Sequence, residues 1–154
     1  MLLTKIKLVV AEDNATVRRG IRSLLNKSQE IEVIGEATNG REALQLVGEI
    51  EPDILLLDVE MPDLNGIQVA RMLKESGHTT RILVLSAYDD QEYIRGMFLN
   101  GASGYLLKDE APERIVDAIK GIAQGENGWV SPQVEARLRK KKGKKGAGID
   151  DKLA

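Results

Sequence analysis

Five short strand signals, four of them apolar runs, alternate with segments of helical periodicity, and this alternation limits how the chain can fold more than any other feature does. The apolar runs lie at 7–11, 54–57, 82–85 and 105–107, and the second strand signal lies at 32–37. Continuous runs of Val, Ile and Leu are typical of parallel strands that are buried on both faces of a sheet. Strand and helix signals in regular alternation predict an α/β fold, in which right-handed crossovers build a doubly wound parallel sheet.

The helical segments between these runs carry start and stop signals. Asn14 is a suitable N-cap for the first helix, and the second should end before Pro52. Gly66 precedes the third, which ends near Gly77, and Pro112 suits the first turn of the fifth. We expect the second strand, at 32–37, to lie at an edge of the sheet.

The composition is that of one soluble domain. The chain has 154 residues, of which 42% are hydrophobic and 30% charged, and it contains no cysteine. No apolar stretch approaches the roughly 20 residues that span a bilayer, and the N-terminus lacks a signal-peptide pattern. The absence of cysteine excludes disulfides, thiolate metal sites and a thiol nucleophile. We therefore expect a cytoplasmic protein that does not contact a membrane.

The charge is unevenly distributed along the chain. The first 131 residues carry 21 acidic and 14 basic side chains, whereas the last 23 carry 3 acidic and 8 basic ones. We expect a domain at 1–128 and a linker or tail at 129–154, with one short helix after Ser131-Pro132 and then disorder through a Lys- and Gly-rich stretch. Trp129 is expected to pack against the last helix of the domain. The closing Asp-Lys-Leu-Ala resembles a vector-derived junction.

Polar residues follow the four apolar runs. Glu12-Asp13 follows the first run, Asp58 the second, Ser86 the third and Lys108 the fourth. In a doubly wound sheet the carboxyl ends of the strands open onto one crevice. Three acids, a hydroxyl and an amine are therefore expected to converge there, and they form the candidate site.

Three carboxylates in one crevice repel one another unless a cation or a proton intervenes. Mg2+ suits them, because it binds one or two carboxylates and keeps positions for water and phosphate oxygens. Asp13 and Asp58 are the expected direct ligands, and Glu12 would hold a water of the ion. Ser86 and Lys108 could bind a phosphoryl group. Asp58 is the expected nucleophile because it ends the central strand.

At these residues the chain resembles the receiver domain of two-component response regulators, from about residue 5 to residue 124. The shared residues are Glu12-Asp13, Asp58, Met61-Pro62-Asp63 with Gly66, Ser86-Ala87, and Gly104-Tyr105-Leu106-Leu107-Lys108. The resemblance implies a flavodoxin-like (βα)5 sheet of order 2-1-3-4-5, the strand order that chemotaxis receivers share. The Gly-Tyr-Leu-Leu-Lys-Asp sequence is similar to that of NarL/FixJ-like regulators.

The resemblance also implies a function. Asp58 would take a phosphoryl group from a sensor histidine kinase, with Mg2+ held by Asp13, Asp58, the backbone carbonyl of Glu60 and, through water, Glu12. Ser86, Ala87, Lys108 and Tyr105 would bind the phosphoryl group and carry the switch. The domain would thus be a phosphorylation-controlled signalling domain that catalyses only its own phosphotransfer and dephosphorylation.

Phosphorylation would then change the surface formed by the fourth helix, the last strand and the fifth helix. Homodimers would form through that surface or through the first and fifth helices. NarL/FixJ-like regulators normally carry a C-terminal helix-turn-helix domain, which this sequence lacks, so DNA would be bound only through an absent domain. Either the chain was cut in the linker or the protein is a single-domain regulator.

Other classes of phosphate-binding protein need residues that this sequence lacks at the same positions. A haloacid-dehalogenase-like phosphatase needs Asp-x-Asp after its first strand, where this chain has Glu-Asp-Asn. A flavodoxin needs a hydroxyl-rich phosphate loop there, and no G-x-x-x-x-G-K-[ST] sequence indicates nucleotide hydrolysis. The alternative that stays open is a receiver-like interaction module that works without phosphate.

Overall fold

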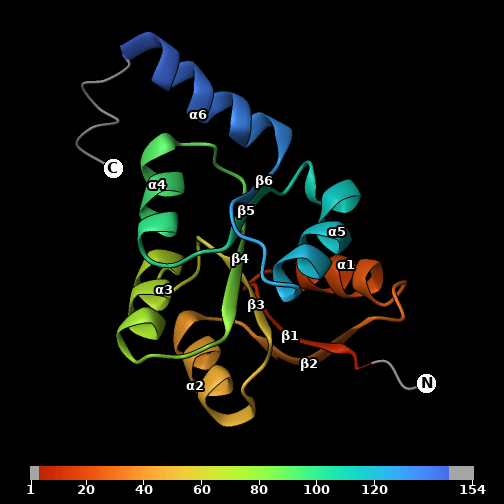
Figure 1. Cartoon of the computed structure of the whole chain (residues 1–154). Coiled ribbons are helices and arrows are strands. Elements are labelled where there is room, and N and C mark those ends of the chain that lie inside the picture. Colours follow the sequence, from red (N-terminus) through yellow and green to blue (C-terminus); the bar gives the residue numbers. More distant parts are fainter. Residues whose placement is uncertain (1–3, 146–154) are drawn as a thin grey trace.

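The computed structural model describes residues 4–145, and side chains as far as residue 139. It contains a six-stranded, fully parallel sheet of order β2-β1-β3-β4-β5-β6 (Figure 1). The strands are β1 (Ile6–Ala11), β2 (Ile31–Ala37), β3 (Ile54–Asp58), β4 (Arg81–Ser86), β5 (Gly104–Leu107) and β6 (Trp129–Val130). The helices are α1 (Ala15–Leu25), α2 (Gly40–Ile50), α3 (Gly66–Glu75), α4 (Gln91–Leu99), α5 (Ala111–Ala123) and α6 (Pro132–Lys145).

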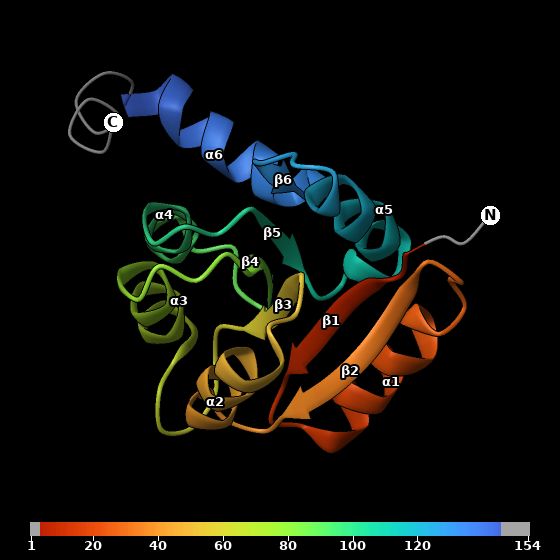
Figure 2. The ribbon, with the colours of Figure 1, turned by 60° about the horizontal axis from the view of Figure 1, so that its bottom comes forward.

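Helices cover both faces of the sheet. Figure 2 shows α1 and α5 on one face and α2, α3 and α4 on the other. Successive residues of the central strand β3 point alternately into these two layers, so that Leu56 packs with the α1 and α5 side and Leu57 with the α2, α3 and α4 side. Both side chains are buried, which explains why the strand sequence is apolar throughout.

The predicted elements agree with the observed ones. The order 2-1-3-4-5 of the first five strands is confirmed, and β2 lies at an edge of the sheet as expected. The Asn14 side chain accepts a hydrogen bond from the Val17 N–H and caps α1 as predicted. Pro112 lies in the first turn of α5. Among residues 4–145, no helix combines the length and the apolar character that a membrane span requires.

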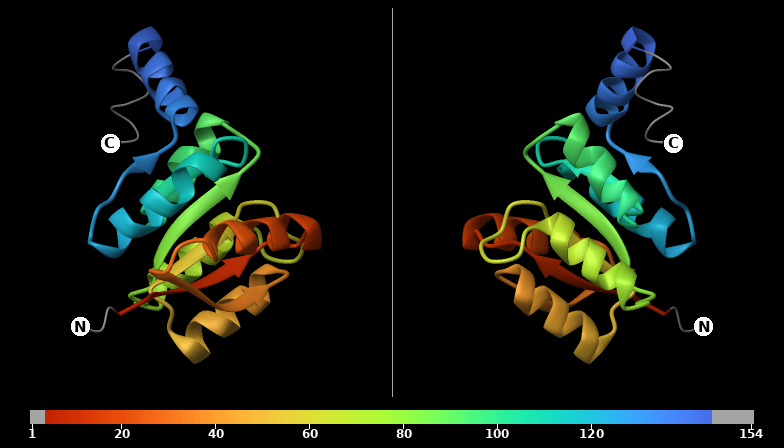
Figure 3. Two further views of the ribbon diagram at one scale, coloured as in Figure 1. Left: turned by 90° about the vertical axis from the view of Figure 1, so that its right-hand side faces the viewer. Right: turned by 90° about the vertical axis from the view of Figure 1, so that its left-hand side faces the viewer.

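The structure differs from the prediction after residue 128, where the chain adds a sixth strand to the sheet. Residues 129–130, which the sequence predicts as part of a linker or tail, form β6 and pair with Gly104 and Tyr105 of β5. The following helix α6 is longer than the short one expected, because it continues to Lys145 through part of the Lys-rich stretch. Figure 3 shows α6 at the end of the molecule opposite to α2. The proposed vector-derived residues lie outside the described part of the chain.

Trp129 packs against α5, as the sequence analysis expected, and two glycines make room for it. A Cβ atom on Gly121 of α5 would lie 2.5 Å from the Trp129 indole nitrogen and 2.4 Å from the Glu126 carboxylate. A Cβ atom on Gly104 of β5 would lie 2.9 Å from the Trp129 Cβ. The indole N–H donates a hydrogen bond to Glu126. The absence of a side chain at Gly104 and Gly121 therefore leaves the space that Trp129 of β6 occupies.

The packing of Trp129 beside Gly121 can be tested by substitution. Gly121→Ala should displace the Trp129 ring, lower the free energy of unfolding by about 1–3 kcal/mol through overpacking, and shift the tryptophan emission to longer wavelength. The chain has one tryptophan, so the emission reports this ring alone. The matched control is Gly48→Ala in α2, where an added Cβ meets nothing within 4 Å. It should stabilise the protein by roughly 0.5–1 kcal/mol. Equal stability and emission in the two variants would contradict this packing.

Candidate functional site

The carboxyl edge of the sheet gathers three acidic side chains. Glu12 and Asp13 follow β1, and Asp58 is the last residue of β3. Each can offer a carboxylate oxygen such that the three oxygens lie within 4.8 Å of one another. Glu12 and Asp58 are only 2% and 4% exposed, whereas Asp13 is open to solvent. The cluster therefore has a buried floor and an accessible rim.

The register of the strands brings Ser86 and Lys108 to the same edge. Asp58 pairs with Leu85 in β4, so Ser86 lies one residue further along. Ser86 in turn pairs with Leu107 in β5, and its carbonyl accepts a hydrogen bond of 2.8 Å from the Lys108 N–H. The five residues predicted to converge thus all stand at one edge of the sheet.

Lys108 places its ammonium group between the two buried acids. Its Nζ lies 2.9 Å from Glu12 Oε1 and 3.5 Å from Asp58 Oδ2. Burial alone would lower the pKa of Lys108, but the hydrogen bond to Glu12 and the charges of Asp58 and Glu12 raise it overall. The ammonium group therefore stays charged and offsets part of the negative charge of the cluster.

Asp58 is hard to ionise in this environment. Its burial, followed by the negative charge of Glu12, raises its pKa to about 7, although Lys108 and the hydrogen bond from the Glu60 N–H act in the opposite direction. That backbone bond is 3.1 Å long and reaches Asp58 Oδ1. One ammonium group is therefore not enough to keep all three carboxylates ionised at neutral pH.

The donor set of the cluster fits a hard divalent cation. Three ionised carboxylates and the ammonium group of Lys108 carry a formal charge of about -2, and all the anionic donors are oxygens. A hollow of about 490 Å³ opens beside Asp13 and is also lined by Glu60, Asn65 and Tyr93. Asp13, Asp58 and Glu12 could hold the ion, and the hollow leaves room for its water or for a phosphoryl group. The role of the Glu60 backbone carbonyl as a metal ligand stays a prediction.

Ser86, Tyr88 and Tyr105 form a hydrogen-bonded chain next to the cluster. Ser86 Oγ is buried and accepts a bond of 2.9 Å from the Tyr88 N–H, and the Tyr105 hydroxyl donates a bond of 2.8 Å to the Tyr88 carbonyl. The Tyr105 ring is fully buried, and this burial raises its pKa to about 12 although a hydrogen bond with Ser86 opposes the shift. Ala87 lies exposed between Ser86 and Tyr88.

Glu60 and Tyr88 meet at the rim of the site. Both residues are exposed, and a hydrogen bond between the Tyr88 hydroxyl and the Glu60 carboxylate, together with the charge of that carboxylate, raises the pKa of Tyr88. The loop that carries Glu60 depends on Gly66, because a Cβ atom there would lie 2.8 Å from Val59 Cα and 3.0 Å from the Asp58 carbonyl. Gly66 thus allows the loop after Asp58 to fold back closely.

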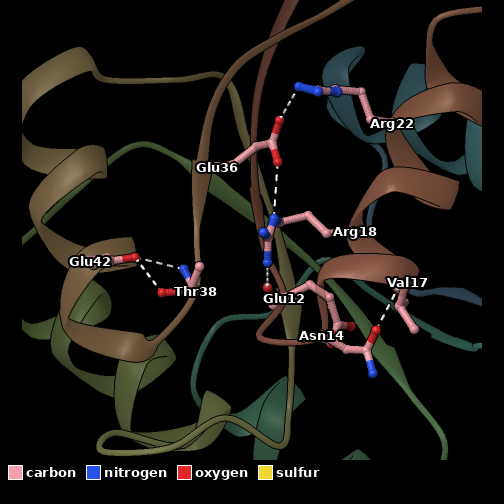
Figure 4. Close-up of polar contacts among 8 residues, drawn as sticks. All are labelled: Glu12, Asn14, Val17, Arg18, Arg22, Glu36, Thr38 and Glu42. Atoms are coloured by element: carbon pink, nitrogen blue, oxygen red, sulfur yellow. Dashed lines mark hydrogen bonds and ion pairs between the residues drawn. The ribbon is translucent and has the colours of Figure 1, made fainter.

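Arg18 contacts the acidic loop, and sequence reasoning missed it. From α1 its guanidinium donates a bond of 2.7 Å to the Glu12 carbonyl and one of 3.0 Å to the Glu36 carboxylate (Figure 4). Arg22 binds the other Glu36 oxygen, and the Asn14 N–H donates to Glu12 Oε2. Two arginines one helical turn apart were the available signal, but their partner on β2 could not be read from the sequence.

The family model for the response regulator receiver domain matches residues 8–120. The chain belongs to this family. It is 35% identical over 136 residues to the transcriptional regulatory protein DegU of Brevibacillus brevis, with 88% of this chain and 57% of that protein covered. It is 40% identical over 122 residues to the oxygen regulatory protein NreC of Staphylococcus epidermidis, with 79% and 56% covered. The receiver domain thus spans about half the length of these curated relatives.

Solved receiver structures have the same fold. The receiver domain of the putative response regulator NarL from Mycobacterium tuberculosis is 36% identical and superposes with a TM-score of 0.77, covering 80% of this chain and 99% of that chain. A LuxR-family two-component response regulator from Aurantimonas sp. SI85-9A1 gives a TM-score of 0.85 at 28% identity, with 90% and 99% covered. The chain is therefore a NarL- and DegU-like receiver, which is a signalling domain.

The raised pKa of Asp58 predicts a pH-dependent penalty in the metal-free protein. Because the folded protein holds this proton up to about pH 7 and the unfolded chain only to about pH 4, the stability from Asp58 is lost as pH rises through that window. Asp58→Asn removes the penalty, so without metal the variant should exceed the parent by about 1–3 kcal/mol at pH 8 and by much less at pH 4.5. Chemical denaturation measures the difference.

Asp63→Asn is the control for this prediction. Asp63 follows the same strand, but it is exposed and pairs with Arg41 outside the cluster. Its substitution should change the stability by less than about 1 kcal/mol at either pH. A variant Asp58→Asn that is less stable than the parent at pH 8 would show that Asp58 is not under charge strain.

The Arg18 contact predicts an effect on cation binding from outside the cluster. Arg18→Ala frees the Glu12 carbonyl and the loop that carries Glu12 and Asp13, so it should weaken Mg2+ binding roughly tenfold, as loss of a group that orients a ligand does. Titration calorimetry measures the affinity. Arg19→Ala, at an exposed neighbouring position, is the control and should bind as the parent does. Equal affinities of the two variants would rule out this role.

Proposed function

We propose that this receiver is phosphorylated on Asp58 by a sensor histidine kinase, in a reaction that requires Mg2+. The observation that carries the proposal is the cluster of Glu12, Asp13 and Asp58 with Lys108, at the carboxyl edge of a receiver fold. In a buried cluster of this charge, Asp58 gains nucleophilic character only when a cation offsets its neighbours.

The proposed reaction moves a phosphoryl group from nitrogen to oxygen. An ionised oxygen of Asp58 attacks the phosphorus of a phosphohistidine, a P–O bond forms while the P–N bond breaks, and the departing imidazole takes up a proton. Mg2+ supplies charge neutralisation for the carboxylates and for the transferred group. Asp13, Asp58 and the Glu60 carbonyl would hold the ion directly, with Glu12 acting through water.

The neighbouring residues have separate tasks in this proposal. Lys108 offsets the charge on the phosphoryl oxygens, and the Ser86 hydroxyl and the Ala87 N–H donate hydrogen bonds to them. When Ser86 turns toward the phosphoryl group, it gives up its bond with the Tyr88 N–H. Tyr105, which is hydrogen-bonded to Tyr88, follows this change and transmits it to α4, β5 and α5.

The output that fits the relatives is control of transcription in the cytoplasm. DegU of Brevibacillus brevis is named a transcriptional regulatory protein, and this chain covers about half of it, so DNA would be bound by a part that lies outside this sequence. Dimerisation would assist that binding. Of the two expected faces, α1 and α5 are favoured, because an apolar hollow of about 300 Å³ lined by Ile21, Leu24 and Ile115 lies between them.

Labelling with a small phosphodonor tests the assignment of Asp58. With acetyl phosphate and Mg2+ the parent should gain one phosphoryl group by intact mass, and chelation of the metal should abolish the gain. Asp58→Asn should gain none, because an amide cannot act as the nucleophile. Asp63→Asn, which removes an exposed acid after the same strand, should react as the parent does. Full labelling of Asp58→Asn would place the phosphate elsewhere, and an unreactive parent would favour a module that works without phosphate.

A further inference from the structure

The β6–α6 segment, residues 129–139, is built into the domain rather than attached loosely to it. Ser131 is fully buried, its hydroxyl accepts a bond of 3.2 Å from the Leu107 N–H, and its own N–H donates to the Tyr105 carbonyl. Trp129 occupies the space beside Gly104 and Gly121. The segment therefore continues the sheet edge that carries Tyr105.

The first two turns of α6 then cover the end of α4. Val134 is fully buried in the same apolar cluster as Ile94 and Met97 of α4, and Leu138 packs against that cluster. Figure 1 shows α6 crossing above α4 and the β5–β6 edge. The face of α4 and β5 is therefore occupied by the chain's own C-terminal segment.

Asp89, in the loop between β4 and α4, is one polar anchor of α6, beside the Glu110 carboxylate, which accepts hydrogen bonds from the Gln133 N–H. Its carboxylate accepts bonds from the Arg137 guanidinium at 2.9 and 3.3 Å and from the Gln133 side chain at 3.1 Å. The hydrogen bonds from Arg137 and then Gln133 lower the pKa of Asp89, so it is ionised at neutral pH. The contact joins a basic tail to an acidic domain, as the uneven charge of the sequence favours.

This anchor stands at the end of the hydrogen-bonded chain that begins beside Asp58. Asp89 is the third residue after Ser86 and the first after Tyr88, whose N–H and carbonyl bind Ser86 and Tyr105. A movement of Ser86 toward Asp58 therefore removes a support of the loop that carries Asp89. Tyr105 also faces the segment through its carbonyl, which binds Ser131.

We propose that the face of α4 and β5 is a docking surface for α6, and that phosphorylation of Asp58 releases α6 from it. The inference rests on the proposed function for its trigger, whereas the docking itself rests on the contacts of Asp89, Arg137 and Val134. The β6 strand stays in the sheet, held by Trp129 and Ser131, and acts as the hinge about which α6 moves.

Thermodynamic coupling makes the proposal reciprocal. If phosphorylation favours the released state, a substitution that releases α6 should in turn favour phosphorylation, because the cost of undocking α6 is removed. Arg137→Ala should therefore raise the phosphorylated fraction at subsaturating acetyl phosphate about threefold or more, although Arg137 lies outside the acidic cluster. The matched control is Arg139→Ala on the same helix, because among the residues whose side chains the structure describes Arg139 pairs within α6, with Glu135.

Spin-label distances measure the release directly, because the cysteine-free chain allows two cysteines to be labelled selectively. One pair joins α3 to α6 through Arg71→Cys and Ala136→Cys, both at exposed positions. A reference pair joins α3 to α5 through Arg71→Cys and Glu113→Cys. The first pair should give one narrow distance distribution in the unphosphorylated chain, and a broad, longer one after reaction with acetyl phosphate and Mg2+. The reference pair should not change.

Three variants separate the steps in the α3–α6 pair. Arg137→Ala should broaden the distribution without phosphate, whereas Arg139→Ala should keep it narrow. Ser86→Ala should be phosphorylated to a smaller extent, and its phosphorylated fraction should keep α6 docked, because the hydroxyl that starts the movement is absent. Intact mass is recorded on each sample, so that the extent of phosphorylation is known for every distance.

The outcomes distinguish this proposal from the proposed function. A phosphorylated parent with an unchanged α3–α6 distance would overturn the release while leaving the function of Asp58 intact. Identical distributions for Arg137→Ala and Arg139→Ala would overturn the docking contact. An unphosphorylated parent would contradict the proposed function and remove the trigger, and the comparison of the two arginine variants would still decide whether Asp89 anchors α6.

Discussion

The burial of like charges at the carboxyl edge of the sheet is the constraint on which the rest of the site depends. Glu12 and Asp58 are almost inaccessible to water, yet they share one ammonium group, that of Lys108. Such a cluster is stable only if it takes up a proton or a cation, and the raised pKa of Asp58 is the signature of the first choice. The groups around it, from Arg18 to the Glu60 N–H, hold acids in place that would otherwise separate.

The repulsion within the cluster also explains how a phosphoryl group added to Asp58 would affect residues outside the cluster. Ser86, Tyr88 and Tyr105 are joined by single hydrogen bonds, and Tyr88 is followed at once by Asp89, which binds α6. A change at Ser86 therefore reaches the loop that carries Asp89 through two hydrogen bonds of Tyr88 and one peptide bond. In the proposed release, the apolar packing of Val134 opposes the undocking of α6. The ion pair of Asp89 with Arg137 is the contact that breaks.

Sequence reasoning reached the acidic cluster because parallel strands place their ends together, so Asp58 and Lys108 could be associated without knowing any side-chain contact. Sequence reasoning did not predict β6, because a strand of two residues has no periodicity. Its packing also depends on Gly104 and Gly121, which lie in other elements. The pairing of Asp89 with Arg137 spans 48 residues, and surface charges of both signs are common, so only the folded structure selects this pair.

Titration of the metal-free chain with Mg2+ tests the central claim most directly, if calorimetry is run at pH 7 in two buffers of different ionisation enthalpy. We predict that Mg2+ binds and releases protons, because burial and the charge of Glu12 raise the pKa of Asp58 to about 7, so that part of this carboxyl is protonated at pH 7 and must ionise in the complex. The heats in the two buffers should then differ accordingly. An absence of Mg2+ uptake at millimolar concentration, or binding with no release of protons, would contradict the account.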